Sequence, residues 1–183
     1  MAFAPDVVAA LGAAAELVNE PEITGSIEEL TAFYDRWGYS GALPRTPGEL
    51  AAVRAVLPEL RALLTADRES AVVLVNEILT TQNAVPQLVR HDSQDWHIHA
   101  ISEDRPMQEQ ILVETAMAMV DVVRLDETGR LQVCAASDCD GVVIDMSRNR
   151  SRRFCSTTCG NREAQAAYRA RRARTFPQGS DPA

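Results

Sequence analysis

The sequence Cys134-Ala-Ala-Ser-Asp-Cys139 is followed, after fifteen intervening residues, by Cys155-Ser-Thr-Thr-Cys159. These segments contain all four cysteines of the 183-residue chain. Two close pairs of cysteines with a hairpin-length segment between them can bring four thiolates to one tetrahedral ion. The spacing therefore predicts one Zn²⁺ held by Cys134, Cys139, Cys155 and Cys159.

Three other states of the cysteines are open: disulfides, an iron–sulfur cluster, and buried thiols without a ligand. The N-terminal residues carry acidic side chains and no basic leader, so we expect no signal peptide. Disulfides are correspondingly disfavoured. Four thiolates fill the coordination shell of zinc and leave no position for water, so the predicted site is structural rather than catalytic.

The residues around the cysteines indicate a treble-clef-like module. Segments 141–145 and 152–154 can pair as strands around the turn 146–151. A run without helix breakers follows Cys159, so the second cysteine pair should lie at a helix N-terminus, where the helix dipole favours thiolates. In that helix we expect Ala164, Ala167 and Tyr168 to pack against the finger or the rest of the chain.

The first 125 residues are mostly helical in pattern. Apolar residues recur at helical spacing between Val7 and Val18, over 50–64, over 68–80 and after Pro106. Capping boxes at 26–29 and 46–49 mark two helix starts, and Pro58 should kink or interrupt the second of these helices. Asn19 is expected at a helix end or turn, with a polar contact in a ligand pocket as the alternative.

The fold class that follows is mainly α with a small β-hairpin (α+β). We expect a helical N-terminal domain over residues 1–130, with the hairpin near 84–102. A zinc finger with a basic C-terminal helix should span 131–174, and residues 175–183 should form a disordered tail.

Charge is distributed unevenly along the chain. The 26 acidic residues and 18 basic residues, all arginine, give a net charge of −8. Nine of the arginines lie within 148–174, where Glu163 is the one acidic residue. The overall charge opposes nucleic-acid binding, but this basic segment is where such binding is expected.

The segment Ser147–Cys155, followed by Cys159-Gly160-Asn161-Arg162, resembles the CGNR zinc finger. Upstream, Leu17-Val18-Asn19, 95–99 and 116–119 are similar to the ABATE domain that accompanies this finger, although Glu20 stands where the family often has threonine. The resemblance covers residues 1–174. It implies a bacterial transcriptional regulator, in some cases stress-induced, that binds zinc and DNA.

Candidate nucleic-acid contacts lie in the basic segment and at the start of its helix. They are Arg148, Arg150, Arg152, Arg153, Asn161, Arg162, Arg169 and Arg172. On the helix, the last three arginines fall close to one face, where they can contact phosphates. The alternative is that the arginines near the cysteines neutralise the charge of the zinc site.

His97 and His99 would lie on the same face of a strand, in line with Asp95 and across the hairpin from His91. They could bind a metal or another ligand. The alternative is a polar sheet face, with Trp96, Ile98 and Ala100 pointing into the core.

The leading hypothesis is therefore a cytoplasmic, non-enzymatic DNA-binding regulator. Its N-terminal domain would sense a small-molecule effector or mediate homodimer formation. A second hypothesis is a zinc-stabilised protein-interaction module that does not bind DNA. A third, an enzyme using His97 and His99, is weaker because no nucleophile–base pair or phosphate-binding loop is present. No apolar run reaches the length of a membrane span.

Overall fold

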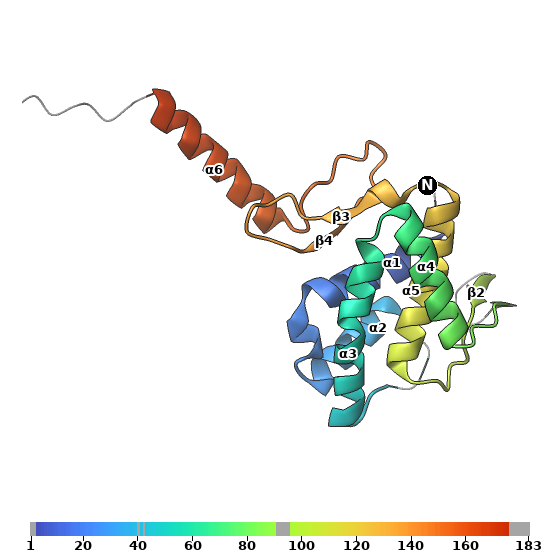
Figure 1. Ribbon diagram of the computed structural model, residues 1–183. Helices are drawn as coiled ribbons and strands as arrows, with labels where there is room; N and C mark the ends of the chain where they lie inside the picture. The colour runs from blue at the N-terminus through green and yellow to red at the C-terminus, as the bar shows by residue number, and fades with distance from the viewer. Residues whose placement is uncertain (1–2, 40, 42, 91–95, 176–183) are drawn as a thin grey trace, which may run out of the picture.

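A computed structural model of the protein describes residues 3–39, 41, 43–90 and 96–175. The chain is mainly helical with two small antiparallel sheets, as predicted (Figure 1). Its helices and strands are α1 (Pro5–Asn19), α2 (Ile27–Trp37), α3 (Pro47–Leu64), α4 (Arg68–Thr81), β1 (Gln87–Val89), β2 (His97–His99), α5 (Met107–Arg124), β3 (Leu131–Val133), β4 (Val142–Ile144) and α6 (Thr157–Thr175). Short 3-10 helices occupy Pro21–Thr24 and Thr128–Arg130. None of the helices in the described ranges is long and apolar enough to cross a membrane.

Helix starts follow the predicted capping signals. Thr46 accepts a hydrogen bond from the Glu49 backbone N–H, and the Glu49 carboxylate accepts one from the Thr46 backbone N–H, which completes a capping box. Ser26 caps α2 by accepting a hydrogen bond from the Glu29 backbone N–H, without the reciprocal bond that would complete the predicted capping box. Pro58 does not interrupt α3, which continues past it to Leu64.

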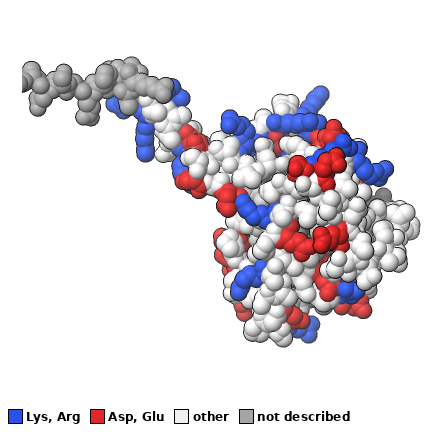
Figure 2. Space-filling view, in the orientation of Figure 1, with Lys and Arg blue, Asp and Glu red and all other residues white. Residues whose placement is uncertain are grey.

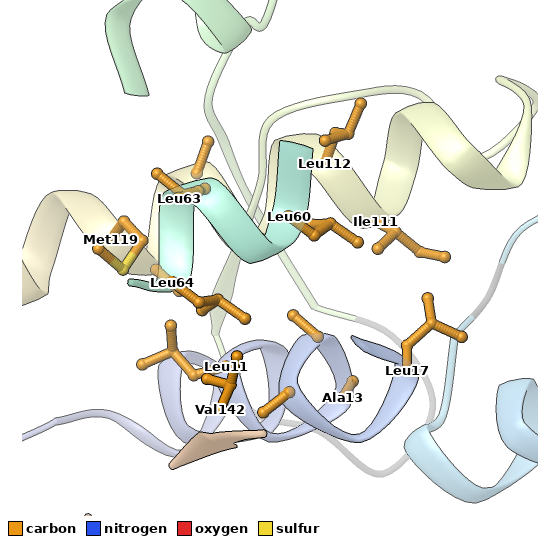
Figure 3. Packing of buried hydrophobic residues seen from close by; sticks show 14 of the residues in the cluster. Leu11, Ala13, Leu17, Leu60, Leu63, Leu64, Ile111, Leu112, Met119 and Val142 are labelled. Atoms are coloured by element: carbon orange, nitrogen blue, oxygen red, sulfur yellow. The ribbon is translucent and has the colours of Figure 1, made fainter. Parts of the chain in front are cut away.

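The core is formed where α1, α3 and α5 pack together (Figure 3). Leu11 and Leu17 of α1 face leucines of α3 and apolar residues of α5, and all of these are fully or almost fully buried. Val142 of β4 packs against α1 in the same cluster. The second sheet is therefore attached to the helical core by apolar contacts as well as by the chain connection.

Both sheets are two-stranded. The predicted hairpin is present, with Gln87 opposite His99 and Leu88 opposite Ile98, although each strand has three residues and the turn 91–95 lies outside the described residues. In the second sheet β4 pairs with β3, with Leu131 opposite Ile144.

The predicted pairing of 141–145 with 152–154 is therefore wrong. Asp145 is the cause, because its carboxylate accepts hydrogen bonds from the backbone N–H groups of Ser147 and Arg152. The loop is closed by that side chain, and the segment 152–154 makes isolated hydrogen bonds instead of a ladder. One of these runs from the Ala135 backbone N–H to the Arg153 carbonyl.

Helix α6 projects away from the body of the molecule (Figure 1). The prediction that Ala164, Ala167 and Tyr168 pack against other parts of the chain is wrong, since all three are exposed and Tyr168 retains 56% of its accessible surface. The helix extends through Thr175, and residues 176–183 of the predicted tail lie outside the described residues.

Asn19, the last residue of α1, joins the helical core to β4. Its amide NH₂ donates to the Val142 carbonyl at 2.8 Å, and its amide oxygen accepts from the Val142 backbone N–H at 2.7 Å. Arg61 of α3 adds an ion pair of 3.2 Å with Asp140. The predicted position at a helix end is confirmed, but the partner of Asn19 is a strand of the finger.

Candidate metal centre and nucleic-acid interface

The four cysteine sulfurs gather in one cluster in which all Sγ atoms lie within 4.8 Å of one another. Cys134 and Cys139 come from the loop between β3 and β4, Cys155 precedes α6, and Cys159 lies in its first turn. This is the predicted arrangement of one pair on a loop and one at a helix start. The polypeptide thus brings cysteines 25 positions apart in sequence to a single point.

The spacing of the sulfurs fits zinc. The Cys139 and Cys155 sulfurs are 3.6 Å apart, and those of Cys155 and Cys159 are 3.7 Å apart. A tetrahedral ion with Zn–S bonds of about 2.3 Å requires sulfur separations of about 3.8 Å. The donor set and its geometry therefore fit one structural zinc ion held by the four cysteines.

Backbone N–H groups point at the sulfurs from within the loops. The Cys155 backbone N–H donates to the Cys134 sulfur and the Gly141 N–H donates to the Cys139 sulfur, both at 3.4 Å. A side chain at Gly141 would place its Cβ 2.9 Å from the Cys155 sulfur, so glycine is required there. These contacts fix the thiolates and disperse their negative charge.

The thiols differ in acidity when no metal is bound. A side-chain hydrogen bond with Ser156 lowers the pKa of Cys159 to about 7, whereas burial and the neighbouring thiols raise the pKa of Cys155 to about 12. Because thiolates are the metal-binding form, zinc affinity must fall as the pH is lowered.

Several of the predicted nucleic-acid residues are engaged within the protein. Arg162 forms a 2.6 Å ion pair with Asp138 and donates to the Cys159 sulfur at 3.4 Å, so it offsets charge at the cysteine cluster. Arg152 donates to the Cys155 carbonyl at 2.9 Å. Arg150 forms a 2.7 Å ion pair with Glu127. Of these three arginines, Arg162 is the one in contact with a cysteine sulfur, whereas Arg150 and Arg152 bind a carboxylate and a backbone carbonyl of the surrounding loops.

The remaining predicted residues are open to solvent. Arg153 lies 6.0 Å from the centre of the Phe154 ring, while Asn161 is exposed at the start of α6. Arg148, Arg169 and Arg172 are exposed, and the described part of the chain offers none of them an ion pair. Figure 2 shows arginines along α6, at a distance from the acidic groups on the body. The structure thus divides the arginines into a group that supports the finger and a group available to a partner.

The histidine pair faces inward. The Nε2 atoms of His97 and His99 lie 3.1 Å apart, which confirms that the two rings share one face of β2. The expectation that Trp96 and Ile98 point into the core is wrong, because they are 63% and 45% exposed while Ala100 is buried. The face of β2 that carries His97 and His99 is directed toward the helices, and the face that carries Ile98 is directed to solvent. The suggested partners His91 and Asp95 lie outside the described residues.

Both histidines line a cavity of about 210 Å³ between α1, α5, the end of α2 and β2. Among its other lining residues are Trp37, Tyr39 and Glu114. Neither Tyr39 nor Glu114 was among the predicted site residues. The sequence feature that could have indicated a site is the carboxylate of Glu114, which lies between the buried residues Val113 and Thr115 of α5.

The fold and the cysteine cluster define a zinc-finger protein with a helical N-terminal part. Residues 130–172 match the family model described as CGNR zinc finger. Residues 4–125 match the ABATE model, described as "Putative stress-induced transcription regulator". The chain therefore belongs to the ABATE family and carries a CGNR zinc finger. Both are regulator or zinc-finger families rather than enzyme families. No match to the chain is found among curated proteins.

Proposed function

We propose that this protein is a bacterial transcription regulator that binds DNA through α6 and the arginines of its zinc finger. The observation that carries the proposal is that α6 stands clear of the body with Arg169 and Arg172 exposed and without ion pairs to the described residues. Arginines held on a rigid helix can contact successive phosphates, and these contacts position a protein on the duplex.

The shape of α6 suits a groove. The helix has 19 residues and its described side chains are exposed for most of its length, so it can be surrounded by a partner. The major groove of B-DNA, about 12 Å wide, accepts one α-helix. Asn161 lies at the start of the helix and is the residue we propose for contact with a base edge.

The acidic body supports an oriented complex. Residues 1–133 contain 21 acidic side chains and 9 arginines, so phosphate is repelled there. Charges further apart than about 8 Å are screened at physiological salt, so this repulsion does not prevent contact at a projecting helix. In this proposal 1–130 is the regulatory domain and 131–174 is the DNA-binding domain of a cytoplasmic protein.

The N-terminal domain has two proposed uses. The cavity lined by His97 and His99 supports the binding of a small-molecule effector. Homodimer formation is the other use. The bonds from Asn19 to Val142 connect α1, which contributes to the cavity wall, with β4 beside the cysteine cluster. Such a connection allows occupancy of the cavity to affect the finger.

The test is binding of the full-length, zinc-loaded chain to fluorescent genomic duplex fragments at several salt concentrations. If Arg148, Arg169 and Arg172 each contact a phosphate, the logarithm of the affinity should fall with the logarithm of salt concentration with a slope of about −2.7. Absence of binding at low salt would refute the DNA proposal. Binding to an acidic protein instead would favour the zinc-stabilised interaction module, whose support is that Arg150 and Arg162 already pair with acidic groups.

A further inference from the structure

The cavity between α1 and α5 exists because α1 presents small side chains to it. Ala9, Ala10 and Ala13 line one wall, and larger residues there would fill the space. The opposite wall comes from α5, where Glu114 and Asp121 recur at helical spacing. An apolar cavity of about 150 Å³ can hold benzene. The present cavity, at about 210 Å³, therefore suits a molecule only slightly larger.

The charges around the cavity are unbalanced. Its lining includes the carboxylates of Asp6, Glu114 and Asp121, and one arginine, Arg124. Arg124 lies 3.9 Å from Asp121, and its side chain is 75% exposed, so that pair is nearly neutral and directed to solvent. Asp6 lies in the first turn of α1, where the helix dipole stabilises its charge. The described residues provide no ion pair for the charge of Glu114, which lies in the middle of α5, away from the helix ends.

Two polar groups of the cavity lack partners within the described part of the chain. No described residue donates a hydrogen bond to the Glu114 carboxylate, and burial raises the pKa of Glu114 to about 7. The Tyr39 hydroxyl is buried without a hydrogen bond. Both groups line the same cavity, and the charge of Glu114 adds to burial in raising the pKa of Tyr39. Unpaired buried polar groups are costly, and a ligand that donates hydrogen bonds removes that cost.

Trp37 provides an aromatic surface that is held in place. Its indole N–H donates to Glu16 at 2.8 Å. Its ring packs on Gly12, where an added Cβ would lie 2.6 Å from the ring. Trp37 and Tyr39 both line the cavity that contains Glu114. Aromatic rings together with a carboxylate are the groups that attract an organic cation.

We propose that this cavity binds a small protonated amine, with the ammonium group at Glu114 and the hydrocarbon part against Trp37 and the alanines of α1. The proposal rests on the effector role suggested above for the N-terminal domain. An anionic ligand is disfavoured because it would face the unpaired carboxylates of Asp6 and Glu114.

The test uses three probes of similar shape: benzylamine, benzyl alcohol and benzoate. Each is titrated into the full-length, zinc-loaded protein at pH 8 and followed by calorimetry and tryptophan fluorescence. We expect the amine to bind about tenfold to a hundredfold more tightly than the alcohol, because its hydrogen bond to Glu114 is charge-assisted. Benzoate should bind most weakly.

Variants identify the cavity as the binding site. Glu114→Gln should remove the preference for the amine over the alcohol, and the chain should still fold because a buried charge is replaced by a neutral group of similar size. The matched control is Glu77→Gln, the same change at an exposed position of α4, which should leave the preference intact.

The proposal is overturned if benzyl alcohol or benzoate binds as tightly as the amine. It is also overturned if the amine does not bind at about 10 mM, a concentration that detects even millimolar affinity, or if its preference survives in Glu114→Gln. None of these measurements involves DNA, so failure here is distinct from failure of the DNA-binding proposal.

Discussion

The paired hydrogen bonds between Asn19 and Val142 should contribute measurably to the stability of the whole chain. Asn19→Ala removes both bonds and leaves the N–H and C=O of Val142 without partners, at a residue that is only 2% exposed. Loss of two such bonds at a largely buried site should lower the free energy of unfolding by about 2–3 kcal/mol. For a chain of this length, this corresponds to a decrease in Tm of roughly 4–12 °C.

The substitution Asn19→Asp distinguishes the effect of the hydrogen bonds of Asn19 from the effect of its side-chain volume. Aspartate keeps an oxygen that can accept from the Val142 N–H, but its second oxygen would face the Val142 carbonyl without a proton to donate. We therefore expect a loss at least as large as that of Asn19→Ala at neutral pH, although the side chain has nearly the same volume. A purely steric role for Asn19 predicts little effect of this substitution.

The assay is urea denaturation followed by circular dichroism, with zinc in excess throughout. Asn76→Ala, on the exposed side of α4, is the control and should be nearly neutral. The m-value should stay unchanged, because the substitution alters stability and not the surface exposed on unfolding. An Asn19→Ala variant within about 0.5 kcal/mol of the parent, the range of ordinary surface substitutions, would show that these two hydrogen bonds do not stabilise the fold.

Three further outcomes are expected. Arg169→Ala combined with Arg172→Ala should reduce the salt slope of DNA binding by about 1.8, whereas Arg45→Ala on the acidic body should not change it; equal slopes in fluorescence-anisotropy titrations would contradict the proposed contacts. Removal of zinc by a chelator, or its release at acidic pH, should reduce helical circular dichroism because α6 loses its anchored start, so an unchanged spectrum with the metal gone would argue against a structural ion. Because burial raises the pKa of Glu114 from its ordinary 4.5 to about 7, the parent should lose stability as the pH rises through this window. Glu114→Gln should therefore be the more stable protein in melts at pH 8 and nearly equal to the parent below pH 4.5, and the opposite trend would exclude the assignment.

Local signals in the sequence were sufficient to predict the helices. The side-chain oxygen of Thr46 and the fixed backbone of Pro47 act within one turn, so the start of α3 could be predicted from neighbouring residues. The cysteine cluster was predictable for a related reason. The chemistry of a tetrahedral ion constrains the spacing of its ligands, whatever the surrounding fold.

The errors concern contacts between distant segments. Strand β4 could pair with either flanking segment. The Asp145 carboxylate binds the Arg152 N–H, which lies in the segment predicted to pair, and closes the turn through the Ser147 N–H. Trp96 and Ile98 are apolar and were placed inside, but the inward face of β2 meets a cavity that accepts His97 and His99. Periodicity states which residues share a face and not which face is buried.

The base of α6 is held by Glu163, which accepts hydrogen bonds from the backbone and hydroxyl of Ser137, and by the ion pair of Arg162. From that base the helix, 19 residues long, extends about 28 Å. Because α6 is fixed at the cysteine cluster, any rotation there moves its far end by a distance that grows with the length of the helix. A tilt of about 10° there displaces the far end by about 5 Å, more than the 3.4 Å of duplex axis that corresponds to one phosphate of one strand. In the proposed complex with DNA, a small rotation at the metal site would thus change which phosphates the arginines reach, with no change in any arginine.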